Sequence, residues 1–523
     1  MNNYSVIPQV IIEIDCSALA NEIIQTIQLI RIKQVLSAPS QGEIILPEAH
    51  ERFSTKALAK IGSLISIKIG DQNQSLFYGQ ITAIEYVYDA SIRPLISIRC
   101  YDLLHQLRKR QPVRTHIHVN LYQLAQELTQ DLGLTIVGGE KTPIAPRLIQ
   151  YKQSDLQFLY KLGEGYGQYL FLNKKHLLIT SLEGTKTNEH LTLGENFYEA
   201  RFSINAETVT ESVTATGWNL QRVTPHSRTV ETSNVETSIH GLIDPADFGT
   251  NGQRMLVDYD VDDENQAETA AQKELDRYIK QQVSLWGVTD GNPDLTPGSA
   301  VHVSGVEASL EGQYVLTEVN HTIDPEKGFI SEINTAPPGI TRKKAFKNAT
   351  IGVVSQVDDP DKLGRIKVSL PTYNNIETDW LEVLTPGAGS QKGQLILPDV
   401  GDNVLLLIIN GEPAQSVVLG GLYGEKDLPQ SVVEDGSVKR YITQTAGKQR
   451  ILLDDAEVSI RIETKNGHSI SMTPEKIGIT RNNGSFVTLT DDRMTIHSET
   501  DLEIEAPGSS ITFRGKKIDF EEA

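Results

Sequence analysis

The 523-residue sequence is poor in the residues that mark several common protein classes. Its two cysteines, Cys16 and Cys100, are too few for a disulfide framework. Methionine (4) and tryptophan (3) are scarce, and no apolar run approaches the roughly 20 residues of a membrane-spanning helix. Lys+Arg number 48 against 68 Asp+Glu, a net charge of −20, which argues against a nucleic-acid binder. Glycine, by contrast, is plentiful (40), and with the other turn residues it favours β-structure.

The amino terminus carries no recognisable export signal. Residues 1–6 contain no basic side chain, and the apolar stretch at residues 10–14 is interrupted by Glu13. We therefore expect the chain to be made in the cytoplasm without a signal peptide, so that any action outside the cell needs another route.

The length suggests about three to five domains, at roughly 100–200 residues each. Residues 4–105 are predicted to be mostly strands, because apolar and polar residues alternate as in Ile65, Ile67 and Ile69. Helices are predicted after Asn120, after Ser154 and over residues 263–283.

A Pro-Pro-Gly stretch within residues 333–347 has the composition of a linker. The block that follows it, residues 349–423, contains five or six short apolar segments, which is typical of a small barrel. Its predicted strands are residues 351–356, 364–370, 381–384, 394–396, 403–409 and 416–419.

The last part of the chain repeats pairs of apolar residues spaced by two. Each pair predicts a short strand with one apolar face, and the steps between pairs are irregular. One chain could hardly enclose such a core, so the pattern favours strands stacked from several chains, with a single-chain β-solenoid as the alternative. The pairs are Ile460/Ile462, Ile470/Met472, Ile477/Ile479, Val487/Leu489, Met494/Ile496, Leu502/Ile504, Ile511/Phe513 and Ile518/Phe520.

Several ordered motifs of the middle block resemble the OB-fold of one family. They are residues 351–354 (IGVV), 358–368 (DDPDKLGRIKV), 379–389 (DWLEVLTPGAG), 397–404 (LPDVGDNV) and 417–423 (VVLGGLY). This tail-spike family includes the VgrG spikes of type VI secretion, the baseplate spikes of contractile-tailed phages and the spikes of extracellular contractile injection systems. Residues 291–298, 310–314 and 151–165 resemble the hub half of the same proteins, and the tail resembles their triple-stranded β-helix.

The resemblance implies a mainly β chain with a few helices. Its parts would be a hub of two β-barrel tube domains plus a helical insert, an OB-fold and a C-terminal triple-stranded β-helix needle. The predicted boundaries are 1–110 for the first hub tube barrel, 111–190 for the helical or mixed insert, 191–340 for the second hub tube barrel with its helix at 263–283, 346–424 for the OB-fold and 441–523 for the β-helix spike.

The resemblance also implies a structural protein and its partners. The chain would form a homotrimer and contact the inner tube protein, baseplate proteins, a PAAR-like tip protein, a cargo or effector and, transiently, the target membrane, but no nucleic acid. It would be assembled into a phage tail-like particle that acts outside the producing cell or at its envelope.

Only seventeen residues, 424–440, separate the OB-fold from the needle, too few for the lysozyme domain that some phage spikes carry. With nothing after the needle, the chain most resembles the spike of an extracellular contractile injection system. A phage tail spike, a type VI secretion VgrG spike, a spike-borne cell-wall hydrolase and a β-rich adhesin are the alternatives.

No catalytic, cofactor-binding or metal-ligating residue is predicted. His116 and His118 could share a strand face as metal ligands do, but we interpret them as a surface pair. Residues 358–361 resemble a calcium loop superficially and are interpreted as an OB-fold loop. Cys16 and Cys100 lie in strand patterns and are expected to be buried.

The candidate site residues are therefore apolar. The predicted trimer core of the needle is Ile477, Ile479, Val487, Leu489, Met494, Ile496, Leu502 and Ile504. The predicted contact with the tip protein is Ile511, Phe513, Ile518 and Phe520, close to the carboxyl terminus.

Overall fold

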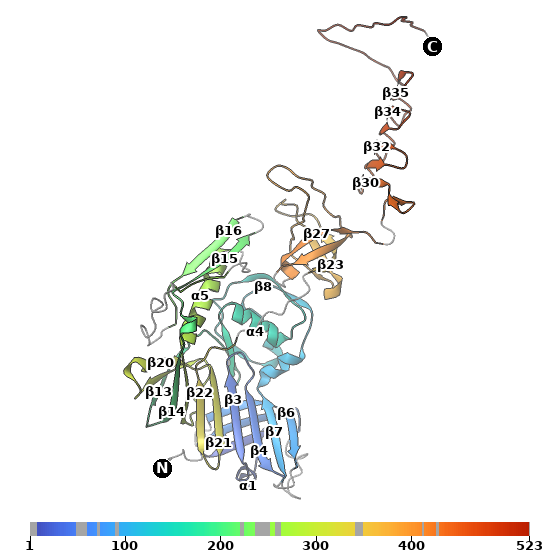
Figure 1. The fold of residues 1–523 in the computed structure, drawn as a ribbon. Coiled ribbons are helices and arrows are strands. Elements are labelled where there is room, and N and C mark those ends of the chain that lie inside the picture. The colour runs from blue at the N-terminus through green and yellow to red at the C-terminus, as the bar shows by residue number, and fades with distance from the viewer. Residues whose placement is uncertain are drawn as a thin grey trace. The chain divides into compact units, whose positions relative to one another are not determined.

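The computed structural model describes residues 8–48, 60–70, 74–88, 94–219, 224–235, 252–256, 263–339, 349–409, 413–424 and 428–521 (Figure 1). The chain divides into two units, Met1–Gly421 and Leu422–Ala523. Strands predominate over helices in both, so the predicted mainly β fold class is confirmed.

One long sheet runs through the hub half of the larger unit. Strand β3 pairs antiparallel with β21, from Glu318↔Val35 to Ile323↔Ile30, so the segments predicted as two tube barrels share a continuous sheet (Figure 1). The order is β14 (Phe197–Ile204), β18 (Val283–Asp290), β22 (Gly328–Asn334), β21 (Glu318–Asp324), β3 (Leu29–Val35), β4 (Gln41–Pro47), β7 (Leu95–Tyr101), β6 (Gln74–Val87), β5 (Leu64–Ile69), β1 (Val10–Ile14) and β2 (Ser17–Ala18).

Period-two alternation gives this sheet one buried and one polar face. Ile30 and Ile32 of β3 are buried, whereas Arg31 and Lys33, which alternate with them, are exposed. The buried face contributes to two hydrophobic clusters, one around β1 and β3–β7 and the other around β14, β18, β19 (Ser299–Ser304) and β22. The small β13 (Thr185–Thr192), β19 and β20 (Gly312–Val315) sheet covers the second cluster.

The predicted helix starts of the insert are confirmed. Asn120 and Ser154 each form a capping box, in which the side chain accepts a hydrogen bond from the backbone three residues on. The helices pack with one another and with two small sheets. The elements are η1 (Leu103–Lys109), β8 (Arg114–Val119), α3 (Leu121–Thr129), η2 (Gln130–Leu132), β9 (Thr135–Val137), β10 (Ala145–Gln150), α4 (Asp155–Gly165), β11 (Tyr169–Asn173) and β12 (His176–Thr180).

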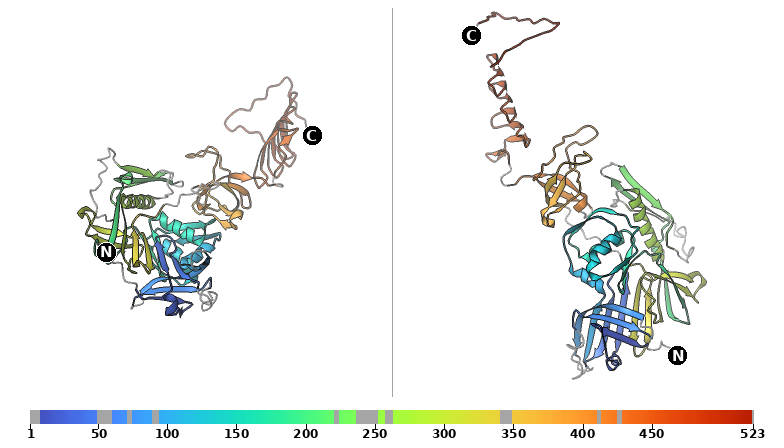
Figure 2. Two further views of the ribbon diagram at one scale, coloured as in Figure 1. Left: turned by 60° about the horizontal axis from the view of Figure 1, so that its bottom comes forward. Right: turned by 180° about the vertical axis from the view of Figure 1, so that it is seen from behind.

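The longest helix, α5 (Glu264–Gln282), begins after its cap Asp263, close to the predicted bounds. One face of the helix carries the apolar residues Ala267, Ala271 and Leu275. This face packs on the sheet formed by β15 (Ser212–Asn219), β16 (Thr224–Val230) and β17 (Gln253–Leu256). Figure 2 shows this yellow-green helix lying along the green strands.

The OB block is a five-stranded sheet closed by single bridges. Its order is β25 (Ile376–Glu377), β24 (Lys367–Leu370), β23 (Ala349–Gln356), β26 (Asn403–Ile408) and β27 (Ser416–Leu422). Bridges Ile366↔Leu381 and Val383↔Val418 connect β24 to β27 through the segment between them. The strand predicted at residues 394–396 is wrong, because Leu395 and Ile396 lie exposed in a loop without a ladder.

The OB block shares its core with the hub insert. Ile149 and Tyr151, at the end of β10, are buried in the same cluster as the OB residues Val354, Val368 and Leu406. The rings of Tyr151 and Tyr373 meet edge to face at 5.1 Å, and Arg147 Nη1 donates a hydrogen bond to the Glu377 carbonyl at 2.7 Å. These contacts join the insert and the OB block independently of the chain that connects them.

The smaller unit contains one antiparallel meander, in which each strand pairs only with its neighbours in sequence. A two-stranded ribbon, β28 (Val433–Glu434) and β29 (Ser437–Val438), precedes it. The strands predicted at 502–504, 511–513 and 518–520 are absent, since residues 498–521 form none. The meander is β30 (Arg440–Gln444), β31 (Arg450–Asp454), β32 (Ser459–Glu463), β33 (Ser469–Met472), β34 (Ile477–Thr480), β35 (Phe486–Leu489) and β36 (Met494–His497).

A carboxyl group is buried where β7 of the long sheet meets the insert. Asp102 Oδ2 accepts a hydrogen bond from the Ser40 backbone N–H at 2.6 Å, and Oδ1 accepts one from the Leu104 N–H at 3.0 Å. Burial outweighs these bonds and raises the pKa of Asp102 from its ordinary 3.8 to about 7.

This raised pKa predicts that the contribution of Asp102 to the stability of the hub falls as the pH rises from 5 to 7.5. The folded state keeps its proton up to a pH of about 7 while the unfolded state has released it, so folding binds protons in this window. We expect the unfolding free energy of the wild type to fall by about 2–3 kcal/mol relative to that of the Asp102→Asn variant, which keeps every other titrating group. Unfolding free energies of both proteins at the two pH values test this, and parallel pH profiles would contradict it.

Candidate functional site: an uncovered apolar face

The meander carries two columns of apolar side chains in register. Cross-strand pairs such as Ile462↔Ile470, Ile470↔Ile479 and Ile479↔Val487 place these residues directly opposite one another on one face. The first column is Tyr441, Leu453, Ile460, Met472, Ile477, Leu489 and Met494. The second is Ile451, Ile462, Ile470, Ile479, Val487 and Ile496.

Both columns are largely exposed. Ile470 is 41% exposed, Ile479 53% and Met494 62%, and Val487 is half-buried. Within the smaller unit no described segment covers this face, although residues of the second column line a shallow hollow together with Leu502. A row of exposed large apolar residues this long is unusual for a monomer and marks an interaction surface.

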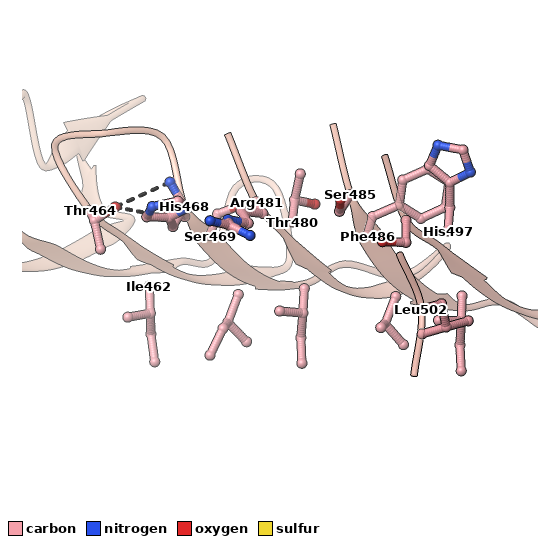
Figure 3. Close-up of a pocket in the computed structure, with 15 residues that line it drawn as sticks. Ile462, Thr464, His468, Ser469, Thr480, Arg481, Ser485, Phe486, His497 and Leu502 are labelled. Carbon is pink, nitrogen blue, oxygen red and sulfur yellow. Dashed lines mark hydrogen bonds between the residues drawn. The ribbon is translucent and has the colours of Figure 1, made fainter. Parts of the chain in front are cut away.

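The opposite face of the meander is mostly polar, with Ile442, Leu452 and Phe486 as its apolar members. Arg461, Ser471 and Thr488 alternate with the apolar residues along β32, β33 and β35. Figure 3 shows Ile462 on one side of the ribbon and His468 and Thr480 on the other. The sheet is therefore amphipathic, and only its apolar face requires a partner.

The turns on one edge stack as a regular unit. Turns begin at Thr464, Arg481 and Ser498, which are 17 residues apart. The regular repeat is therefore a unit of two strands and two turns, although the spacing from one strand to the next is irregular. The Asn482 N–H donates a hydrogen bond to His468 Nδ1 at 3.3 Å, and Gly484 sits at φ +97°, where a side chain would be strained. This stacking keeps the apolar columns in line.

The structure brings six of the eight predicted core residues onto the apolar face. Leu502 and Ile504 follow the last strand, at 58% and 57% exposure. The predicted tip residues Ile511, Phe513, Ile518 and Phe520 lie outside any strand, and their exposures run from 44% to 91%. Sequence reasoning missed Tyr441, Ile451 and Leu453, although the i, i+2 spacing of Ile451 and Leu453 carries the same signal.

Two of the polar candidates occupy different surroundings from those expected. His116 is not on the surface: it is buried, stacks on Phe158 at 5.5 Å and bonds to Glu127 through Nδ1 at 3.0 Å. His118 is exposed and has a left-handed backbone (φ +52°), so the two imidazoles do not form a shared ligand face. Cys100 is buried as expected, but Cys16 is exposed in the turn between β1 and β2.

The aspartate-rich loop at residues 358–361 is organised by an ion pair. Arg365 donates from Nε and Nη2 to the two carboxylate oxygens of Asp359 at 3.0 and 2.7 Å, and both side chains are nearly inaccessible. The guanidinium holds the pKa of Asp359 well below its ordinary range. Asp359 also accepts backbone hydrogen bonds from Asp361 and Leu363, so its oxygens hold the loop together.

Two further observations concern the described part of the chain. No three His, Cys, Asp or Glu side chains in it lie together as metal ligands would. None of its helices is both long and apolar enough to cross a lipid bilayer.

Two family models match the sequence. The type VI secretion system/phage-baseplate injector OB domain matches residues 350–423. The Alg8 N-terminal domain matches residues 10–325, which is more than half of the chain.

Curated relatives match over short stretches. The type VI secretion system spike protein VgrG3 of Vibrio cholerae is 31% identical over 84 residues, 15% of this chain and 8% of that protein. VgrG2a of Pseudomonas aeruginosa is 26% identical over 120 residues, 21% of this chain and 14% of that protein. The matched regions thus span far less than two thirds of these relatives.

Solved structures resemble the fold over much more of the chain. A Francisella PdpA–VgrG complex matches with a TM-score of 0.52 at 10% identity, covering 95% of this chain and 81% of that one. An E. coli type VI secretion component, described as similar to the T4 bacteriophage tail proteins gp27 and gp5, matches with a TM-score of 0.51 at 12% identity, covering 76% and 96%. With its N-terminal region and OB block both matched, the chain belongs to the Alg8 N-terminal domain family, and its OB block and fold resemble those of VgrG-like baseplate spike proteins.

Proposed function

We propose that the chain is the central spike of a contractile injection machine, in which a homotrimer joins the inner tube and baseplate to a membrane-puncturing needle. The observation that supports this most directly is the pair of exposed apolar columns on β30–β36. Three such faces turned inward around one axis would cover each other, since each sheet has one apolar and one polar face.

The energetic gain favours assembly. Burying one large aliphatic side chain is worth about 1.5–3 kcal/mol, and each chain contributes more than ten such residues to its columns. Because these side chains are already about half covered in the single chain, assembly would add about half of this value for each, roughly 10–20 kcal/mol per chain, which offsets the cost of bringing chains together. Continuous strand pairing along the needle then supplies stiffness, while the energy for puncture comes from the contracting machine.

The parent machine we propose is an extracellular contractile injection system, with a phage tail or a type VI secretion system as the alternatives. The chain would be made in the cytoplasm, assembled into a tail-like particle and act outside the producing cell or at its envelope. Its proposed partners are the inner tube protein, baseplate proteins, a PAAR-like tip protein and a cargo or effector, with the target membrane contacted transiently.

The trimer is tested with matched substitutions on the two faces of β33. We expect the wild type to have three times the 57.8 kDa mass of one chain. Ile470→Asp places a charge in the apolar column and should cost at least about 2–3 kcal/mol per chain, shifting the protein towards monomers. Ser471→Asp, on the polar face one residue away, should leave the trimer intact.

Native mass spectrometry and light scattering measure this. A monomeric wild type, or equal effects of the two substitutions, would contradict the proposal.

The tip partner is proposed from the exposed side chains near the carboxyl terminus. Phe520 is 91% exposed and Phe513 63%, so both rings offer apolar surface that a partner could cover. Deleting residues 510–523 should abolish capture of the tip protein in a pull-down while the trimer mass, set by β30–β36, is retained. If the deletion variant captures the tip protein as well as the wild type does, the proposed tip contact is wrong.

We propose a structural rather than enzymatic role. Two deeply buried carboxylates serve as structural anchors: Asp359 accepts hydrogen bonds from Arg365, and Asp155 Oδ1 accepts them from Arg114 Nη2 at 2.6 Å and Gln150 Nε2 at 2.8 Å. A peptidoglycan zymogram with the purified chain should therefore show no lysis. A clear band would favour the spike-borne cell-wall hydrolase instead.

A further inference from the structure

The small sheet of β13, β19 and β20 carries two histidines side by side on its outer face. We propose that His190 of β13 and His302 of β19 bind one divalent transition-metal ion, such as Zn²⁺, between their imidazoles. The inference goes beyond the proposed function, because it concerns an ion site within one chain and does not depend on assembly.

The register of the sheet places the two histidines directly opposite each other. Strands β13 and β19 run parallel, and the pair His190↔His302 is followed in unbroken register by pairs up to Thr192↔Ser304. Neighbouring strands lie about 4.8 Å apart, so two side chains that face each other on one side of a sheet can reach a shared ion.

Burial shows to which side the imidazoles point. Leu191 of β13 and Val301 and Val303 of β19 are buried in the hydrophobic cluster under the sheet. His190 and His302 alternate with these residues and therefore lie on the outer face, where His190 is exposed and His302 half-buried. An ion from solvent can reach both rings without any movement of the core.

The separation of the two rings fits coordination of a single ion. Their centroids are 5.4 Å apart and their planes are inclined at 63°. A Zn–N bond of about 2.0–2.1 Å puts each ring centroid about 3.2 Å from the ion, so two imidazoles at a tetrahedral angle of about 109° have centroids about 5.2 Å apart. An edge-to-face aromatic contact gives a similar separation, and a binding measurement distinguishes the two arrangements.

Hydrogen bonds around the pair hold the strands in this register. Thr192 Oγ1 and Ser304 Oγ lie 3.1 Å apart, two residues further along the same face. Asn196 Nδ2 donates a hydrogen bond to the His190 carbonyl at 2.8 Å, and Asn196 Oδ1 accepts one from the Thr192 N–H at 2.8 Å. The backbone that carries His190 is therefore fixed before an ion binds, which lowers the entropy lost on binding.

The donor atoms determine the class of ion. Imidazole nitrogens suit Zn²⁺, Cu²⁺ and Ni²⁺, whereas Mg²⁺ and Ca²⁺ require oxygen ligands. In the described part of the chain no third His, Cys, Asp or Glu lies with the pair, so water would fill the other coordination positions. The bound ion would tie β13, an edge strand of its sheet, to β19 beyond the irregularity between Lys186 and His190.

Titration of the full-length chain with Zn²⁺ tests the site. We expect calorimetry to show binding that is weakened at least about 100-fold in His190→Gln and in His302→Gln, because each variant removes a direct ligand and even outer partners of a metal site are worth about 10–100-fold. An excess of Mg²⁺ should not displace the Zn²⁺. The matched control is His118→Gln, which removes an exposed histidine of β8 and should bind as the wild type does.

A second measurement counts the imidazoles on the ion. Cu²⁺ bound to the wild type should show the electron-spin-echo modulation of two imidazoles, and neither variant of the pair should show more than one. Circular dichroism and native mass, unchanged in all variants, establish that the substitutions leave the fold intact.

Four results would overturn the inference: no Zn²⁺ binding by the wild type, binding retained in either variant of the pair, an equal loss in His118→Gln, or a single imidazole on the Cu²⁺ of the wild type. The proposed spike is judged separately, by the trimer mass, so either conclusion can fail without the other.

Discussion

A β-sheet with one apolar face must bury that face, and this requirement governs the molecule. In the hub, the insert and the OB block, the same chain supplies the cover: Ala267 and Leu275 of α5 cover the β15–β17 sheet, and Ile149 and Tyr151 complete the OB core. In the C-terminal meander no described segment of its unit performs this task, and the apolar columns stay exposed. The difference separates the parts that fold as a single chain from the part that requires other chains.

The core shared by the insert and the OB block offers a path by which a mechanical force on the hub would reach the OB block. The composition of residues 333–347 favours a linker, which would make the OB block a loosely attached module. Tyr151 packed on Tyr373, and Arg147 bonded to the Glu377 carbonyl, instead join the two regions through side chains. In the proposed spike, a push on the hub would pass into the OB block through this packed contact as well as along the chain.

Features set by local interactions could be predicted from the sequence. The helix starts at Asn120, Ser154 and Asp263 depend on side chains three residues from their partners, and the apolar pairs of the meander depend on period-two alternation. Features set by distant partners could not. His116 is buried because Phe158 and Glu127 approach it from α4 and α3, and its alternation on β8 does not reveal them. Residues 394–396 have strand composition but form no ladder with any described segment; the Gln394 N–H donates a single hydrogen bond to the Pro386 carbonyl at 3.0 Å.

The last three apolar pairs fail to form strands for a reason that follows from the uncovered face. Extending a meander by one short strand adds a few backbone hydrogen bonds, each worth about 1 kcal/mol net, and it costs about 1–2 kcal/mol of backbone entropy per residue. The balance is favourable only when apolar side chains are buried at the same time. Leu502, Ile504 and Ile511 would join columns that are already exposed, so a lone chain gains little from ordering them. On the proposed trimer the same residues would gain burial from the neighbouring chains, and strand formation beyond β36 would then be coupled to assembly.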